Sequence, residues 1–251
     1  MGAHRMVMVI PTYNEHDNLA WIVGRLRRAH PESDVLVVDD NSPDGTGKLA
    51  DELAAADAQV DVLHRTGKQG LGAAYLAGFR VALQRGYDVI GEMDADGSHQ
   101  PEQLGRLLDA LPGADLVLGS RWVPGGSVTN WAWTRQALSR GGNVYARALL
   151  GIPVHDVTGG FRLFRRRTLE TIDLSKVRSV GYCFQTDLVW RTVRAGLRVE
   201  EVPIEFVERV RGESKMNRGV AAESLRRITV WGARQRLRQV RDVLSKQRHN
   251  A

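Results

Sequence analysis

Residues 35–45 have the sequence VLVVDDNSPDG, a short apolar run followed by two carboxylates and a turn that contains proline and glycine. An uninterrupted run of valine and leucine is typical of a strand that is buried on both faces of a sheet. A helix-like segment, residues 48–56, follows directly. A buried strand followed by a helix favours a parallel α/β sheet, in which helices form the crossovers.

The same alternation continues on both sides of this stretch. We expect strands at residues 7–11, 35–39, 60–64, 89–94 and 116–119, and helices at 19–29, 48–56, 72–85 and 102–111. The predicted fold class is α/β, with a Rossmann-like, mostly parallel sheet flanked by helices. The second half is less regular. It predicts a loop and an amphipathic helix over 127–150, one or two short strands over 197–207, interrupted at Pro203, and a long basic amphipathic helix over 220–246.

The composition fits one large domain with an ordinary core, since 43% of the 251 residues are apolar and 25% are charged. No apolar run approaches the roughly 18 residues that indicate a transmembrane helix. The first 30 residues lack a signal-peptide pattern, and a single cysteine excludes an internal disulfide. We therefore expect a protein of the cytoplasmic side, either soluble or peripheral on a membrane.

The net charge of +6 is concentrated near the C-terminus. Residues 209–251 contain twelve Lys or Arg and three Asp or Glu, so the rest of the chain is slightly acidic. This asymmetry indicates an anionic surface or partner for the tail, with a solvated helix face as the simpler alternative. We expect two units: a catalytic domain over residues 1–218 and a basic helix over residues 219–251.

Polar side chains follow three of the expected strands. In parallel sheets the carboxyl ends of the strands form the ligand-binding edge. Residues 11–15 (PTYNE), 39–45 (DDNSPDG) and 94–96 (DAD) supply more carboxylates there than turns require. Asp94 and Asp96, two apart in an extended chain, point the same way and can meet one Mg²⁺ or Mn²⁺ ion, with Ser98 as a further oxygen. A simple acidic turn is the alternative interpretation.

Two further segments favour phosphate groups. Lys68 lies in a glycine-rich segment before an expected helix, where backbone N–H groups attract anions, although neither a Walker motif nor G-x-G-x-x-G is present. Arg135 and Ser139 are four residues apart, so they share a helix face and can approach one phosphate together. Trp131 and Trp133, just upstream, suit either a membrane interface or core packing.

Taken together and in order, these motifs resemble glycosyltransferase family 2. The resemblance is carried by residues 11–15, 38–46, 68–72, 94–96, 119–126, 158–162 and 211–215. Each motif is short, but the ordered set lies within residues 7–218. The resemblance implies a GT-A fold, a GDP-mannose donor, a divalent cation and a polyprenyl (dolichyl-type) monophosphate acceptor.

The resemblance also implies roles for single residues. The D-x-D metal motif corresponds to Asp94 and Asp96, with Ser98 where many relatives carry glutamine. The donor-binding positions are Pro11, Tyr13, Glu15, Val38, Asp40, Lys68 and Ala95, and a loop over the donor diphosphate contains Arg209 and Lys215. The acceptor-phosphate positions are Arg121, Arg135 and Ser139. Asp187 lies where transferases to sugar hydroxyls often keep a base, and we expect it to be structural or sugar-contacting.

The implied reaction is a metal-dependent, inverting transfer of mannose to the lipid phosphate. Some relatives continue into transmembrane helices, whereas this chain continues into a basic helix. That difference implies peripheral binding to an anionic leaflet, or docking on a separate membrane subunit.

Two alternatives stay open at the level of sequence. A different donor, such as UDP-glucose, or a sugar hydroxyl acceptor is compatible with the D-x-D motif. A nucleic-acid-binding module is the more remote reading of the basic tail. It is disfavoured because the main body is acidic and no helix-turn-helix, zinc-finger or RNP pattern occurs, so we expect no nucleic-acid partner.

Overall fold

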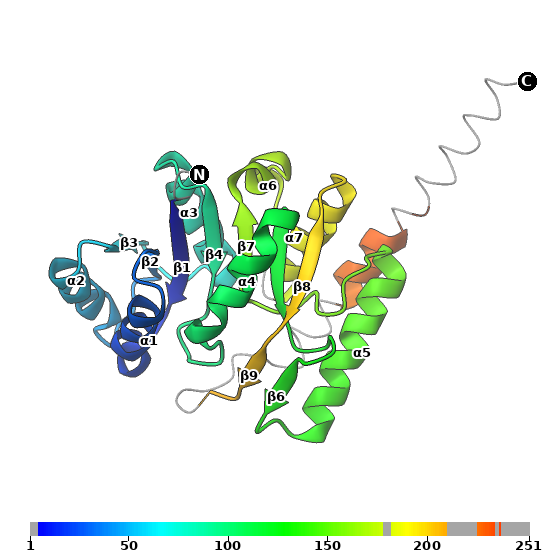
Figure 1. The fold of residues 1–251 in the computed structure, drawn as a ribbon, viewed down its shortest axis with the longest axis horizontal. Helices are drawn as coiled ribbons and strands as arrows, with labels where there is room; N and C mark the ends of the chain where they lie inside the picture. The colour runs from blue at the N-terminus through cyan, green and yellow to red at the C-terminus, as the bar shows by residue number, and fades with distance from the viewer. Residues whose placement is uncertain (1–4, 178–181, 210–224, 234–235, 237–251) are drawn as a thin grey trace, which may run out of the picture.

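The computed structural model describes residues 5–177, 182–209, 225–233 and 236. Within them, the centre of the fold is a seven-stranded sheet with the order β3-β2-β1-β4-β7-β5-β8, and a small sheet pairs β6 with β9 (Figure 1). The strands are β1 (Met6–Thr12), β2 (Asp34–Asp39), β3 (Val60–His64), β4 (Val89–Glu92), β5 (Leu116–Ser120), β6 (Ser127–Thr129), β7 (Arg162–Arg165), β8 (Val199–Pro203) and β9 (Glu205–Val207).

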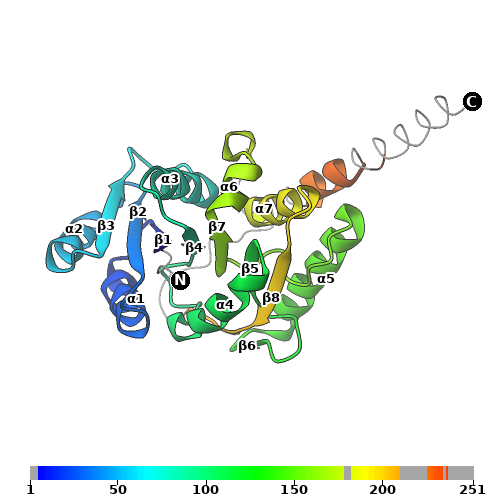
Figure 2. The same cartoon turned by 45° about the horizontal axis from the view of Figure 1, so that its top comes forward.

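Helices connect most of these strands and cover both faces of the large sheet. They are α1 (His16–Ala29), α2 (Thr46–Ala56), α3 (Leu71–Gln84), α4 (Leu104–Ala110), α5 (Trp133–Leu150), α6 (Arg166–Thr171) and α7 (Tyr182–Arg194). Three short 3₁₀ turns complete the set, η1 (Pro101–Gln103), η2 (Leu111–Gly113) and η3 (Leu174–Lys176). Figure 2 shows α3 and α7 on one side of the sheet and α1 and α4 on the other. The expected α/β architecture is confirmed.

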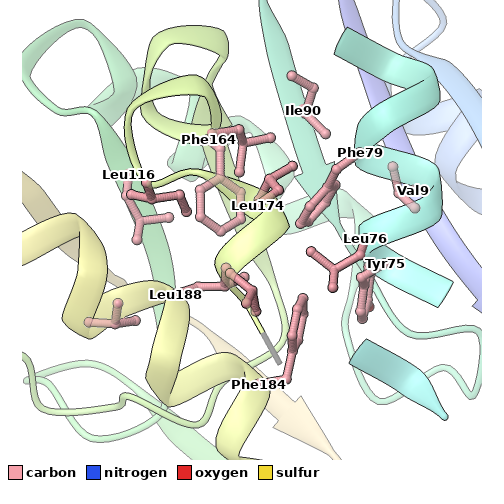
Figure 3. Close-up of a cluster of buried hydrophobic side chains, with 14 of the residues drawn as sticks. Val9, Tyr75, Leu76, Phe79, Ile90, Leu116, Phe164, Leu174, Phe184 and Leu188 are labelled. Atoms are coloured by element: carbon pink, nitrogen blue, oxygen red, sulfur yellow. The ribbon is translucent and has the colours of Figure 1, made fainter. Parts of the chain in front are cut away.

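The central strand β1 explains why the core has two halves. All seven of its residues are buried, and successive side chains point to opposite faces. Val7 and Val9 belong to the cluster under α3 and α7, which Figure 3 shows around Phe79, whereas Met8 and Ile10 pack under α1 and α4. A continuous apolar strand is therefore required here, as the sequence pattern indicated.

One strand of the large sheet, β7, was not predicted from the sequence. β7 runs antiparallel between β4 and β5, although all other pairings in this sheet are parallel. Its sequence RLFR places charges at both ends of a four-residue run, which is a weak strand signal. Arg162 is nonetheless fully buried, because its guanidinium donates to the backbone oxygens of Val157, Gly159 and Gln185. α6 and α7 were also not expected.

The C-terminal helix is described over residues 225–233 and at 236. Ile228 is buried in the main core, and Trp231 stacks on Trp190 of α7 with ring centroids 5.5 Å apart. This part of the basic helix thus packs on the α/β domain, while the rest of residues 219–251 lies outside the described residues. Among the described helices, none is both long and apolar enough to cross a membrane.

Candidate active site

The D-x-D motif follows β4 at the carboxyl edge of the sheet. β4 ends at Glu92, and Ala95 and Asp96 form a turn, so the two carboxylates are not carried by an extended strand as expected. Gly97 has a positive φ of 75° and turns the chain back. The carboxylates are held separately: Tyr75 Oη donates to Asp94 Oδ1 at 3.0 Å, and the Ser98 backbone N–H donates to Asp96 Oδ1 at 3.0 Å. A tight turn, and not strand periodicity, sets the positions of Asp94 and Asp96.

A positive charge already lies against this motif. Nη2 of Arg209 is 3.2 Å from Asp96 Oδ2. Burial alone raises the pKa of Asp96, but the Arg209 guanidinium and the hydrogen bond from the Ser98 backbone N–H outweigh it and hold that pKa below its usual value. Asp96 is therefore ionised at neutral pH. Lys215, the second basic residue expected near the donor, lies outside the described residues.

Two groups beneath the motif were not singled out from the sequence. The Asp94 backbone N–H donates to Nδ1 of His99 at 3.2 Å, which leaves the ring proton on Nε2. Burial lowers the pKa of His99 to about 4, so the ring is neutral at neutral pH. Burial also raises the pKa of Glu92 to about 8, and Arg162, with Nε 3.8 Å from Glu92 Oε2, opposes this shift only in part.

Glycine brings a distant motif against the same carboxylates. A Cβ on Gly160 would lie 3.3 Å from His99 Cε1 and 3.5 Å from Asp94 Oδ2. The segment at residues 158–162 was part of the expected set, and it packs directly beside the D-x-D turn. A side chain at residue 160 would narrow the space at Asp94, which explains why glycine suits this position.

The ends of β1 and β2 form the second part of the edge. Pro11 and Val38 are paired in the parallel register and buried, and Asn14 and Asn41 adopt positive φ angles of 56° and 58° just beyond the strands. Asparagine tolerates this backbone region better than most residues. Both chains therefore turn sharply at the same level of the sheet.

The two aspartates after β2 have different environments. Asp39 accepts hydrogen bonds from Thr12 Oγ1 at 3.1 Å and from the backbone and hydroxyl of Ser42, so it ties the β1 and β2 ends together. Asp40 is paired with Arg65, and the Gln69 backbone N–H donates to it at 3.3 Å. Arg65 was missed because a lone arginine after a strand carries no sequence signal.

The remaining donor positions lie around these turns. Lys68 Nζ lies 4.0 Å from the centre of the Tyr13 ring, a cation–π contact. Glu15 accepts from Asn18 Nδ2 at 2.9 Å, and its backbone N–H donates to Thr46 Oγ1 at 3.0 Å. Tyr13 and Lys68 thus come together from separate loops.

Two of the three expected acceptor residues, Arg121 and Arg135, lie against one tryptophan. The Cζ atoms of Arg121 and Arg135 lie 5.5 and 4.0 Å from the ring centre of Trp131. Trp131 is 9% exposed, and its indole nitrogen has no hydrogen-bond partner among the described residues. Ser139 lies one turn after Arg135 on α5, where its carbonyl accepts from Asn143 Nδ2 at 3.0 Å. Trp133 is instead 78% exposed, so Trp131 is packed inside the protein and Trp133 lies on the surface.

Each arginine has an acidic partner that the sequence did not reveal. Arg121 is 7% exposed and forms a two-pronged pair with Asp156, with Nε and Nη2 both 2.7 Å from carboxylate oxygens. Burial alone raises the pKa of Asp156, but Arg121 more than offsets this and lowers it. Arg135 is paired with Glu208, which follows β9. These pairs keep the local net charge small.

With this geometry in place, comparison with known proteins decides the family. The model of the family described as "Glycosyl transferase family 2" matches residues 7–173. The chain belongs to glycosyltransferase family 2. Across 242 residues it is 58% identical to polyprenol monophosphomannose synthase of Mycolicibacterium smegmatis, covering 96% of this chain and 91% of that protein. It is also 58% identical over 228 residues to undecaprenyl-phosphate mannosyltransferase of Micrococcus luteus, covering 91% and 94%. The family prediction is confirmed.

Solved structures confirm the fold of this family 2 transferase. Glucosyl-3-phosphoglycerate synthase from Mycobacterium tuberculosis, solved with Mn²⁺ and UDP, superposes with a TM-score of 0.63 at 18% identity, covering 90% of this chain and 77% of that one. A mannosyltransferase from Pyrobaculum calidifontis, solved with GDP-Man and Mn²⁺, gives 0.58 at 18% identity, covering 94% and 64%. These similarities support the expected GT-A fold.

The residues at the D-x-D turn of this family 2 chain fit a divalent cation. Asp94 and Asp96 supply carboxylate oxygens, and the buried Ser98 hydroxyl has no hydrogen-bond partner among the described residues. The Arg209 guanidinium stands in for a cation at Asp96. Among the described residues, no group of three or more His, Cys, Asp or Glu is arranged to hold a metal ion, so a cation here would need substrate oxygens as well. That is the usual situation for Mg²⁺ or Mn²⁺ bound with a diphosphate.

Proposed function

We propose that this family 2 glycosyltransferase transfers mannose from GDP-mannose to a polyprenyl (dolichyl-type) monophosphate, releasing GDP. The observation that carries the proposal is the 58% identity, over 96% of the chain, to a protein named polyprenol monophosphomannose synthase. The second relative, an undecaprenyl-phosphate mannosyltransferase, is equally similar. Both names give a mannosyl group and a polyprenyl lipid, as the motifs predicted.

The donor is assigned to the edge formed by β1, β2 and β4. Asp40 with Arg65, and Tyr13 with Lys68, offer polar and aromatic contacts for a nucleoside, and the buried Pro11 and Val38 form the floor beneath them. Ala95, between the two carboxylates, is buried in the apolar core, so we assign only its backbone to the donor edge. Arg209 and Lys215 are proposed to meet the diphosphate.

Asp94 and Asp96, with Ser98, are proposed to hold Mg²⁺ or Mn²⁺. When bound, the ion supplies positive charge that stabilises the leaving diphosphate. The protein prepares its own ligands: Tyr75 fixes one oxygen of Asp94, and the Ser98 backbone fixes one oxygen of Asp96. The carboxylates therefore have defined directions before any ion arrives, and an ion at Asp96 Oδ2 would take the place of the Arg209 guanidinium.

The acceptor phosphate is assigned to Arg121, Arg135 and Ser139. A phosphomonoester has a second pKa near ~6, so it is largely ionised at neutral pH and needs no general base. One phosphate oxygen attacks the anomeric carbon, the bond from that carbon to GDP breaks, and GDP leaves with the electron pair, which inverts the α-linked donor to a β-linked product. Asp156 and Glu208 moderate the charge of the two arginines. The phosphate is therefore held without being fully neutralised, and it stays nucleophilic.

Asp187 gives independent support for a phosphate acceptor. Its carboxylate is 2% exposed and accepts from Arg191 Nε at 2.7 Å, while Arg191 also donates to the Lys176 carbonyl. A carboxylate that is buried and paired with an arginine in this way is poorly placed to take a proton from a sugar hydroxyl. This favours the structural role for Asp187 and the phosphate acceptor over the hydroxyl acceptor.

We propose a peripheral location on the cytoplasmic face of a membrane, because the proposed acceptor is a lipid and the C-terminal segment is basic. We propose residues 1–218 as the catalytic domain and residues 219–251 as a helix that contacts an anionic membrane surface, or a separate membrane subunit. The positive charge of the tail provides the attraction.

Transfer of radiolabelled sugar tests the function directly. The full chain is incubated with GDP-mannose and a short polyprenyl phosphate, with Mg²⁺, Mn²⁺ or EDTA. We expect labelled lipid only with GDP-mannose and a divalent ion. Parallel reactions with UDP-glucose, or with a polyprenol that lacks the phosphate, cover the alternative donor and the hydroxyl acceptor. Labelled product from either of those alone would contradict the proposal.

A further inference from the structure

The outer side of α5 carries an apolar stripe that the proposed chemistry does not use. Trp133, Leu138 and Val144 are 78%, 63% and 61% exposed, and Tyr145 is also on the surface. At 100° per residue, these four side chains fall within a sector about 140° wide. Between them lie Thr134, Ala137, Gly141 and Ala148, which are exposed and uncharged. Large apolar side chains gathered in this way indicate an interaction surface.

A second helix extends the same surface. The hydroxyl of Tyr145 lies 2.7 Å from Thr229 Oγ1, and Gly232 packs against Leu149, so helix 225–233 lies beside α5. Leu225 and Val230 on this helix are exposed as well. Figures 1 and 2 both place α5 at the end of the molecule farthest from α2.

The charges around the stripe have one sign. α5 contains Arg135, Arg140 and Arg147 and no acidic residue, and residues 225–233 contain Arg226 and Arg227 and no acidic residue. Arg140 and Arg226 are exposed. An apolar helix face bordered by arginine matches the boundary between acyl chains and anionic headgroups. A second copy of the same face would instead bring arginine against arginine in a twofold interface.

The inner side of α5 faces the proposed acceptor site. Arg135 and Ser139 lie on that side, and Asn143, one turn further, accepts from the Val157 backbone N–H at 2.8 Å. Val157 follows Asp156, the partner of Arg121. The helix therefore separates the acceptor residues from the apolar stripe by about one helix diameter, ~10 Å.

We propose that the outer face of α5, together with the exposed side of helix 225–233, rests on an anionic lipid bilayer. The stripe enters the headgroup boundary, and the inner side of the same helix then holds Arg135 and Ser139 at the height of a lipid phosphate. The second half of this statement rests on the proposed function. The membrane contact is thus made by the folded domain and does not depend on the basic tail alone.

The test uses the full chain and vesicles of phosphatidylcholine with about one quarter phosphatidylglycerol. The variant Leu138→Asp/Val144→Asp places two charges in the stripe. The control Ala55→Asp/Ala58→Asp makes the same charge change on exposed positions at and after the end of α2. We expect the stripe variant to lose about tenfold or more in vesicle affinity, because charged side chains oppose insertion, and the control to lose less than about twofold. Activity on a short, water-soluble polyprenyl phosphate without vesicles should stay within about twofold of the parent for both.

A fluorescent label reports the contact directly. Leu138→Cys and Ala55→Cys are each labelled with the environment-sensitive dye NBD, and the parent protein is the labelling control, because Cys183 is buried. We expect the Leu138 label to shift to the blue on adding vesicles and the Ala55 label to stay unchanged. Equal vesicle binding by the stripe variant and its control, or an unshifted Leu138 label, would overturn the proposal. So would a parent dimer that the stripe variant converts to monomers, since the face would then join two copies.

The outcomes keep this proposal separate from the proposed function. Stripe-dependent vesicle binding without any mannosyl transfer would refute the function and leave the membrane contact standing. Mannosyl transfer together with vesicle binding that does not depend on the stripe would refute the membrane contact and leave the proposed function standing.

Discussion

Arg121 and Arg135 approach the indole ring of Trp131 together, with their Cζ atoms 5.5 and 4.0 Å from its centre. They come from different elements, since Arg121 follows β5 and Arg135 lies in the first turn of α5. Their surroundings differ: Arg121 is buried in a two-pronged pair with Asp156, whereas Arg135 is partly exposed beside Glu208. The two arginines therefore call for different experiments.

Arg135→Ala should raise the KM for the acceptor or lower turnover. Loss of one charge-assisted contact costs about 1.5–3 kcal/mol, or roughly 10- to 150-fold in acceptor KM or turnover. GDP-mannose binding, measured by calorimetry with a divalent ion, should change much less. Ser139→Ala, which removes only a neutral hydroxyl, should cost less than Arg135→Ala. If Arg135→Ala lost donor affinity and kept its acceptor KM, the assignment of the acceptor site would be wrong.

Arg121→Ala should destabilise the fold as well as the reaction. The substitution leaves Asp156 buried and charged without its partner, which costs about 3–5 kcal/mol. Urea unfolding measures this loss. The double variant Arg121→Ala/Asp156→Ala should recover part of it, while acceptor turnover stays low. Equal stability of the single variant and the parent would show that the pair has little energetic weight.

Asp94→Asn and Asp96→Asn should each remove most of the activity while keeping the shape of the turn. Each change removes a negative charge that the proposed cation requires. Asp96→Asn also leaves Arg209 without this carboxylate partner. Activity is measured over a Mn²⁺ titration, with circular dichroism as the folding control. Normal turnover of the double variant in EDTA would disprove the metal role.

Tyr75→Phe should weaken metal binding without disturbing the core. The tyrosine ring stacks on Phe184 and tilts against Phe79, and phenylalanine preserves these contacts (Figure 3). Only the hydrogen bond to Asp94 is lost, and residues that orient metal ligands typically contribute about 10- to 100-fold in affinity. Mn²⁺ binding in the presence of GDP, followed by electron paramagnetic resonance, measures the effect. Unchanged Mn²⁺ affinity would show that Asp94 needs no such support.

Glu92 should make stability depend on pH. Its pKa is raised to about 8 in the folded protein, so between roughly pH 4.5 and 8 the folded state holds a proton that the unfolded state has lost. The free energy of unfolding should therefore fall as pH rises, by at most about 1.4 kcal/mol per pH unit. Urea unfolding at pH 6.5 and 8 measures this fall, and the contribution of His99 is common to the parent and to the variant described next. Glu92→Gln stays neutral and should show a smaller fall, and an identical fall would contradict this assignment.

Deleting residues 237–251 should weaken binding to anionic vesicles at low salt. This segment contains four Lys or Arg and one Asp, and screening by salt reduces such attraction. The deletion keeps Ile228 and Trp231, which pack on the domain, so the fold should remain intact. Activity on short acceptors should survive better than activity on long ones. Equal sedimentation of both forms with vesicles at low salt would show that the tail makes no membrane contact.

The sequence by itself determined the α/β class, the parallel strands and the edge that carries the site. Strands buried on both faces must have a continuous apolar run, as residues 6–11 of β1 and 35–38 of β2 do, and polar residues are then found at the strand ends. The D-x-D motif and the ordered family motifs are short stretches of neighbouring residues, so they can be recognised from the sequence alone. Even there, the extended geometry expected for Asp94 and Asp96 is replaced by a turn at Gly97.

Only the tertiary structure decided which side chains pair with the residues of the site. Asp156 meets Arg121 across 35 residues, Glu208 meets Arg135 across 73, and Tyr75 meets Asp94 through a hydrogen bond from α3. β7 enters the sheet because its buried Arg162 finds three carbonyl oxygens, a compensation that no local pattern encodes. Trp131 precedes α5 and is buried, whereas Trp133 is the first residue of α5 and is exposed, so two tryptophans only two positions apart have opposite environments. Such pairings depend on which distant segments the fold brings together, because desolvation and charge act through space and not along the chain.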